Sequence, residues 1–433
     1  MKRERNACPR KVSQTLCAIA VILAGFGLSP HMYAQETILD SLTGSDGAQP
    51  TAGLTPDGAG NYYGTTLMGG TSGFGTVFEL SPNSSGGWTE TVLYNFTNGT
   101  DGGQPASGVV RDASGNLYGT TEFGGGGCTG GGCGVAFKLS KQSSGWTETV
   151  LHAFTGGSDG GAPNGVILDA RGRLYGSAGV GGASGNGVVF ELSRNASGVW
   201  SETVIYSFTG GTFGGRNPSG NLVFDSSGRL YGATLYSGAG GGGIVFRLTP
   251  SQSGVWSERL IHNFTGYSDG SVPNGGLVLD SAGNIYGTAQ AGGNAAYCNH
   301  YGCGVVFKLS PQAGGGWDET ALYIFTGGTD GGAPLAGPAI DSAGNLYGTT
   351  SQGGNASFCG GQGGCGVVFE ISPGATGYTE SVLHEFTNGP DGAFPGAGLT
   401  RDASGNLLGT TFAGGVLSDC SGSGCGVIFE VAP

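Results

Sequence analysis

One unit recurs seven times in this 433-residue chain, from Glu36 to its last residues. Each copy begins on a segment close to Glu-Thr-Val-Leu, continues through one close to Gly-Asn-Leu-Tyr-Gly and ends on one close to Val-Phe-Glu-Leu. Successive copies begin 54 to 61 residues apart, at residues 36, 90, 148, 202, 258, 319 and 380. A tandem repeat of this length indicates one supersecondary unit per copy, stacked in a row or arranged in a ring.

Each unit contains four short runs typical of β-strands, for example at 148–154, 165–169, 174–178 and 187–193. Clusters of Gly, Asp, Asn and Pro separate these runs, as in an all-β fold. A Gly-rich calcium β-roll would need a nine-residue period, which the chain lacks. Seven units of four strands predict a seven-bladed β-propeller. A Glu-Thr-Val-Leu strand follows every unit except the last, so we expect the N-terminal strand at 36–42 to fill this vacancy and close the ring.

The first 34 residues differ from the rest of the chain. A basic segment that contains Lys2, Arg3 and Arg5 precedes an apolar run at 16–28, which is too short to span a bilayer. This pattern is typical of a secretory signal peptide, so we expect a secreted, periplasmic or cell-surface protein. We expect one domain at 35–433, with repeat units at about 36–80, 90–139, 148–192, 202–248, 258–309, 319–371 and 380–431.

The predicted mature chain is strongly acidic. Residues 1–34 hold five of the 17 Lys and Arg and one of the 30 Asp and Glu, which leaves 12 against 29 and a net charge of −17. Nucleic acids and anionic membranes both need patches of Lys and Arg. We therefore expect no nucleic-acid partner and no stable insertion into a membrane, and we expect a monomer.

The repeated motifs resemble a known family. The segment Asp-Ala-Ser-Gly-Asn-Leu-Tyr-Gly-Thr-Thr at 112–121, the paired glycines after it and the two flanking strand motifs are similar to those of the GloVer tandem-repeat proteins. The resemblance covers essentially all of 36–431, and it implies an exported bacterial repeat protein without an assigned activity. Members are described as carrying C-terminal surface anchors, whereas here Pro433 follows the last strand almost at once. We therefore expect release or periplasmic residence.

The loop between the second and third anchors differs between the blades. From the last Gly of the second anchor to the Phe of the third, its length is 14 residues in blades 1, 3 and 4, and 18, 20, 21 and 20 in blades 2, 5, 6 and 7. Only the longer loops carry cysteine, and in an exported chain such pairs indicate disulfides. Zinc is the alternative for the pair that flanks His300. The predicted disulfides are Cys128–Cys133, Cys298–Cys303, Cys359–Cys365 and Cys420–Cys425.

The loops of blades 5 and 6 concentrate aromatic and hydrogen-bonding side chains that strand packing does not require. Such groups suit a sugar ring or a peptide, and a disulfide lowers the entropy lost when a ligand binds. The alternative is that the aromatic side chains only cap the end of the barrel. The candidate ligand-binding residues are Tyr297, Asn299, His300, Tyr301, Phe358 and Gln362.

No cofactor is expected. Six of the seven turns between blades contain Asp-Gly, and such a ring of carboxylates could hold calcium, but the interpretation that we favour is that each Asp bonds the backbone of its own turn. No catalytic motif of the metalloprotease or serine-hydrolase type is present. We expect a non-catalytic scaffold that binds an extracellular glycan, peptide or envelope component. The alternative is a polysaccharide hydrolase or lyase in which Asp419 and an Asp-Gly carboxylate act as acid and base.

Overall fold

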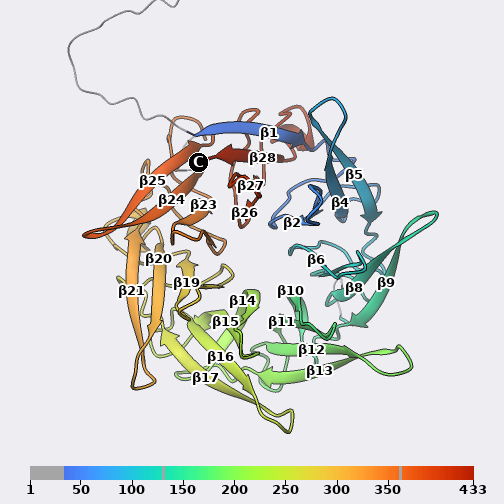
Figure 1. Ribbon diagram of the computed structural model, residues 1–433, viewed down its shortest axis with the longest axis horizontal. Coiled ribbons are helices and arrows are strands. Elements are labelled where there is room, and N and C mark those ends of the chain that lie inside the picture. Colours follow the sequence, from blue (N-terminus) through green and yellow to red (C-terminus); the bar gives the residue numbers. More distant parts are fainter. Residues whose placement is uncertain (1–33, 129–131, 360–362) are drawn as a thin grey trace, which may run out of the picture. The chain divides into compact units, whose positions relative to one another are not determined.

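The computed structural model describes residues 34–128, 132–359 and 363–433. The predicted signal peptide, apart from Ala34, lies outside these residues, and so does Gln362. The described part contains 28 strands in seven four-stranded antiparallel sheets. The sheets surround a central axis, with β2, β6, β10, β14, β18, β22 and β26 innermost in their sheets (Figure 1). The prediction of an all-β, seven-bladed propeller with four strands per blade is confirmed.

Within blades 1 to 6 the strands are arranged in sequence order from the central axis of the ring outward. In blades 1 to 4 they are β2 (Thr55–Pro56), β3 (Tyr62–Thr66), β4 (Thr76–Pro82), β5 (Trp88–Asn95); β6 (Val110–Arg111), β7 (Leu117–Thr120), β8 (Val135–Gln142), β9 (Gly145–Ala153); β10 (Gly161–Leu168), β11 (Leu174–Val180), β12 (Val188–Arg194), β13 (Trp200–Ser207); β14 (Gly215–Phe224), β15 (Leu230–Ser237), β16 (Ile244–Pro250) and β17 (Trp256–Asn263).

Blades 5 to 7 repeat this order, and two short 3-10 helices lie in their loops. The elements are β18 (Val278–Leu279), β19 (Ile285–Ala289), η1 (Cys298–His300), β20 (Val305–Pro311), β21 (Trp317–Ile324); β22 (Ala339–Ile340), β23 (Leu346–Thr350), β24 (Val367–Gly374), β25 (Gly377–Glu385); β26 (Thr400–Arg401), β27 (Leu407–Thr410), η2 (Cys420–Gly422), β28 (Val427–Ala432) and β1 (Gln35–Ser41).

The N-terminal strand closes the ring as the order of the repeats predicts. Strand β1 is the outermost strand of blade 7 and pairs antiparallel with β28, from Gln35 opposite Ala432 to Ser41 opposite Val427 (Figure 1). Between blades 7 and 1, the Thr400 hydroxyl donates to the carbonyl of Leu54 at 2.6 Å. The two ends of the repeat array are therefore joined by a sheet and by contacts between neighbouring blades.

The repeated phenylalanines build the core. The Phe of each Val-Phe-Glu-Leu motif is completely buried, and a second buried Phe follows the outermost strand of blades 1 to 6. The second Phe packs edge to face or tilted on the first Phe of the next blade, as in Phe96–Phe137 with ring centroids 5.1 Å apart and Phe154–Phe190 at 5.0 Å. Each unit therefore buries its apolar face only against a neighbour, which explains why the chain needs a complete ring.

A glycine on the second strand of every blade makes room for this phenylalanine. A Cβ atom added at Gly287 would lie 2.5 Å from Cζ of Phe307 and 2.9 Å from a methyl group of Leu277. We expect Gly287→Ala to lower the free energy of unfolding by about 1–3 kcal/mol because the core is overpacked. Gly314→Ala is the matched control, since a Cβ atom there would meet nothing within 4 Å.

The double variant Gly287→Ala/Phe307→Leu tests the cause of that loss. A shorter side chain at 307 removes the clashing ring atoms, so the added cost of Gly287→Ala should be smaller in the Phe307→Leu background. Urea denaturation of the four proteins measures the coupling. Equal costs of Gly287→Ala in both backgrounds would contradict this account of the glycine.

One backbone hydrogen bond recurs at each blade junction. The residue before a repeated proline takes a φ of 51° to 57° and donates its N–H to a carbonyl in the loop of the preceding blade. The N–H of Ala333 donates to the carbonyl of Cys303 at 2.8 Å, and that of Phe394 donates to Cys365 at 2.8 Å. The other five donors are Gln49, Gln104, Ala162, Asn217 and Val272. These bonds hold the innermost segment of each blade at a constant distance from its neighbour.

Candidate functional site

A cavity of about 680 Å³ lies at the centre of the ring. Every blade contributes the segment that follows its repeated proline. The residue directly after that proline lines the cavity in all seven blades, which makes a ring of equivalent positions. We call this set the post-proline ring: Thr51, Ala106, Asn164, Ser219, Asn274, Leu335 and Gly396.

The wall beside this ring is mostly backbone. A Cβ atom at Gly53 would lie 2.8 Å from the carbonyl oxygen of Gly398, and one at Gly108 would lie 2.9 Å from the carbonyl oxygen of Gly53. Neighbouring blades approach too closely here for a side chain. Hydroxyl groups of the second strands fix the same segments, as Thr65 donates to the carbonyl of Ser107 at 3.0 Å and Thr349 to that of Ala397 at 3.0 Å.

The two sides of the cavity differ in polarity. Blades 3 to 5 present amide and hydroxyl groups: the Asn164 side chain donates to the carbonyl of Pro218 at 2.6 Å, and the Ser219 hydroxyl donates to the Asn274 side chain at 2.6 Å. Blades 6 and 7 present Leu335 and the rings of Phe394 and Phe412, and Phe412 is 37% exposed. An amide-rich wall therefore faces an apolar one.

In the part of the chain that the structure describes, no ionisable side chain lines this cavity: the lining residues carry no carboxylate, imidazole, amine, guanidinium, thiol or phenol. The lining offers hydrogen-bonding groups and apolar surface.

The sequence-predicted ligand residues lie elsewhere. Tyr297 and Tyr301 flank η1 in the blade 5 loop and are 42% and 79% exposed, and Phe358 in the blade 6 loop is 45% exposed. Asn299 and His300 form part of η1 and are exposed. None of these residues lines the central cavity. The structure thus groups four of them in one loop, and their role in binding stays a prediction.

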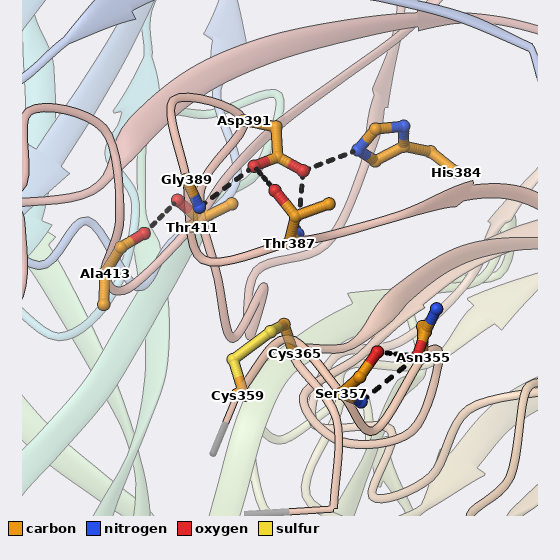
Figure 2. The surroundings of a disulfide bond; sticks show 10 residues. All are labelled: Asn355, Ser357, Cys359, Cys365, His384, Thr387, Gly389, Asp391, Thr411 and Ala413. Atoms are coloured by element: carbon orange, nitrogen blue, oxygen red, sulfur yellow. Dashed lines mark hydrogen bonds and ion pairs between the residues drawn. A yellow bond between two sulfur atoms is a disulfide. The ribbon is translucent and has the colours of Figure 1, made fainter.

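The four predicted disulfides are present, with Cα atoms 5.3 to 5.4 Å apart. They lie beside the turn of the next blade: a Cβ atom at Gly327 would lie 2.6 Å from Sγ of Cys298. Figure 2 shows Cys359–Cys365 near the turn that contains Asp391. Each disulfide therefore supports its own loop and the surface of a neighbouring blade.

The Asp-Gly turns use their carboxylates internally. Asp391 accepts hydrogen bonds from the N–H and the hydroxyl of Thr387 at 2.8 and 2.5 Å, and it lies 3.5 Å from His384 (Figure 2). Burial alone would raise the pKa of Asp391, but hydrogen bonds from His384 and Thr387 lower it below its usual range. Within 34–128, 132–359 and 363–433, no group of three His, Cys, Asp or Glu residues is suited to a metal ion.

Sequence reasoning missed a set of glutamates on the outermost strands. Burial raises the pKa of these carboxyls, and neighbouring aspartates at most junctions raise it further. The resulting pKa is about 8 for Glu90 and about 7 for Glu36, Glu148, Glu202, Glu319 and Glu380. Their buried Oε1 atoms have no hydrogen-bond partner among the described residues. Each of these glutamates begins a repeat unit, so the sequence marks its position in the unit but not its burial.

Comparison with known proteins gives a family and a fold. The model of the Gloeobacter/Verrucomicrobia repeat matches residues 26–214, 85–299 and 295–433. No curated protein matches the sequence. No helix in the described residues is long and apolar enough to cross a membrane.

Two solved structures have a similar fold. The extracellular domain of BT4673 from B. thetaiotaomicron is 10% identical with a TM-score of 0.53, over 93% of this chain and 40% of that one. The chain therefore spans less than half the length of that protein. An ulvan lyase of family PL25, bound to -[GlcA(1-4)Rha3S]-, is 12% identical with a TM-score of 0.54, over 92% and 96% of the two chains. At these identities the similarity shows the fold alone.

Proposed function

The chain belongs to the Gloeobacter/Verrucomicrobia repeat family, and from this premise we propose that it is an exported, non-catalytic propeller that binds an uncharged ligand in its central cavity. A neutral glycan is the ligand class that fits best. The observation that carries the proposal is a cavity of about 680 Å³ in which none of the described lining residues is ionisable. Ligand pockets of this size commonly combine apolar walls with a few polar groups that orient the ligand.

The polarity of the wall supports a sugar. Asn164, Asn221 and Asn274 offer amide groups that can donate to and accept from vicinal hydroxyls. Across the cavity, Phe394 and Phe412 offer aromatic surface for the apolar face of a pyranose ring. A charged ligand would lose its hydration without gaining a counter-charge here. An uncharged peptide segment shares part of this chemistry but lacks the regular hydroxyls.

The loops are proposed as outer contacts for a longer ligand. Tyr297, Asn299, His300 and Tyr301 remain exposed in the blade 5 loop, as does Phe358 in blade 6. Export is supported by the four disulfides, which persist in oxidising compartments.

Catalysis on a polysaccharide is the alternative, and its support is the fold shared with an ulvan lyase. Glycoside hydrolysis needs two carboxyl groups about 5 to 10 Å apart across the bond that is cleaved. Asp419 precedes η2 and is bonded by the Ser418 hydroxyl at 3.3 Å, while the aspartates of six Asp-Gly turns accept bonds from their own threonines. These contacts favour structural roles for the candidate acid and base.

Titration with neutral oligosaccharides, followed by calorimetry, tests the proposal. Asn221→Ala and Phe412→Ala should each weaken binding by about tenfold, since each removes one hydrogen bond or one stacking surface. The control Tyr301→Ala changes an aromatic side chain outside the cavity and should retain affinity for short ligands. Binding that is lost in Tyr301→Ala and kept in the two cavity variants would move the site to the blade 5 loop. Product formation abolished by Asp419→Asn would establish the enzymatic alternative.

A further inference from the structure

A second cavity, of about 830 Å³, lies between blades 3 and 4. Its walls come from the turn between β10 and β11, from β12 and β13, from the turn between β14 and β15, and from the hairpin between β16 and β17. No residue is shared with the central cavity. We call it the blade 3–4 groove.

The carboxylates of the blade 3–4 groove are already paired. Arg173 lies 2.7 Å from Asp169 and 3.2 Å from Glu191, and Arg229 lies 2.5 Å from Asp225. In five other blades the position of these arginines is held by asparagine, which bonds the turn aspartate without adding charge. In blades 3 and 4 the turn aspartates Asp169 and Asp225 are therefore paired with arginine instead of asparagine.

Arg171 lines the same groove and is exposed. Its guanidinium has no ion pair and no hydrogen bond within the part of the chain that the structure describes. The equivalent turn positions in the other blades hold only alanine or serine. Arg171 thus places an unpaired positive charge at a formed cavity, and guanidinium is the group that best matches the planar oxygens of carboxylates and sulfates.

The charge of the whole molecule favours this sector for an anion. Blades 3 and 4, residues 161–263, carry seven arginines and five Asp or Glu, whereas the remainder of 35–433 carries five Lys or Arg and 24 Asp or Glu. An anionic ligand is repelled by most of the ring and least by these two blades.

Aromatic and hydroxyl groups complete the lining. Trp256 is partly buried beside Tyr175, with ring centroids 5.9 Å apart, and Phe224, Ser226 and Ser251 also line the groove. An indole that keeps part of its face free suits the apolar face of a sugar ring, and the hydroxyls suit sugar hydroxyls. We propose that the blade 3–4 groove binds an acidic oligosaccharide, with its carboxylate or sulfate on Arg171.

The test compares tetragalacturonic acid with its fully methyl-esterified form, titrated into the disulfide-bonded mature protein. The acid should bind at least about tenfold more tightly than the ester, which lacks the charge that pairs with Arg171. Arg171→Ala should remove this preference, and a rise in salt from about 0.05 to 0.5 M should weaken binding of the acid by screening. Arg216→Ala is the matched control, because it removes an exposed arginine from the opposite end of blade 4.

Each outcome decides the proposal. The proposal is supported if the protein prefers the acid, Arg171→Ala removes this preference and Arg216→Ala retains it. Tighter binding of a sulfated tetrasaccharide that also depends on Arg171 supports the proposal as well and identifies sulfate as the group. Equal binding of acid and ester, no binding of the acid, or tighter binding of tetraglutamate than of any sugar would overturn it. Variants of the central cavity should leave these results unchanged, so the two sites fail independently.

Discussion

Deletion of residues 36–42 should open the ring and cause aggregation or a large loss of stability. Strand β1 is the outermost strand of blade 7, and its loss would expose the backbone edge of β28. The deletion also removes the buried side chains of Leu39 and Leu42, and each buried leucine stabilises a fold by about 1.5–3 kcal/mol. With the lost strand pairing we expect a decrease of at least about 5 kcal/mol, or about 10 °C in melting temperature.

Point variants separate closure from a general effect of shortening the chain. Leu39 is 7% exposed, whereas Thr37 on the same strand is exposed. Leu39→Asp buries an unpaired charge and should destabilise strongly, while Thr37→Asp should change the melting temperature by about 1 °C or less. Calorimetry of the deletion and both variants measures this. A truncated protein that melts like the full chain would show that β1 does not close the ring.

Stability should fall as the pH rises from about 4.5 to about 7. The six outer-strand glutamates have an ordinary pKa of 4.5, which the fold raises to about 7 for five of them and about 8 for Glu90. Within this window the folded state retains protons that the unfolded state releases, so the proton-linked stabilisation is complete below 4.5 and is lost as the pH passes the folded pKa. Six sites act in the same direction.

Other ionisable groups limit this pH dependence of stability at lower and at higher pH. The pKa values of Asp57, Asp112, Asp280 and Asp341 are lowered: burial alone would raise them, but hydrogen bonds from their own turns more than offset it. Their stabilisation is present above 3.8 and is lost in stronger acid. Burial lowers the pKa of His262, which opposes the glutamates, but it is a single site. The melting temperature should therefore be highest near pH 4 to 5.

Glu90→Gln tests the source of this pH dependence. Glutamine resembles the protonated carboxyl, so the variant should gain about 1–2 kcal/mol relative to the natural chain at pH 8 and almost nothing at pH 4.5. Glu385→Gln, at the end of β25, is the control for removal of a negative charge. Melting curves at the two pH values are compared. Equal effects of Glu90→Gln at both would contradict the assignment.

The fold could be predicted because it depends on repeated local signals. In one unit the sequence predicts strands at 148–154, 165–169, 174–178 and 187–193, and the strands of the structure are Gly145–Ala153, Gly161–Leu168, Leu174–Val180 and Val188–Arg194. Alternation and turn residues place strands in this way whatever their distance from the axis. The innermost strands of five blades have only two residues, so their alternation carries little information.

The central cavity could not be predicted in the same way. Its lining depends on the radius of the ring and on which side chains point inward, and neither is a property of one unit. The aromatic residues around η1 are conspicuous in the sequence because such residue types are unusual in a Gly-rich loop. The post-proline ring contains ordinary small residues, such as Ala106 and Ser219, whose importance lies in their shared position. A comparison of the seven units at each position, rather than of loop lengths, contains the missing signal.

Because of the post-proline ring, much of the specificity of the cavity can be inferred from a few positions of the sequence. Glycine contacts and the hydrogen bond before each proline hold the wall backbone, so the chemistry that a ligand meets depends on one ring residue per blade together with Asn221, Phe394 and Phe412. In this chain the seven residues of the ring, from residue 51 to residue 396, are TANSNLG in one-letter code. The same seven positions can be identified in any relative that has the same anchors. Two relatives with different residues at these positions should prefer different ligands although their rings superimpose.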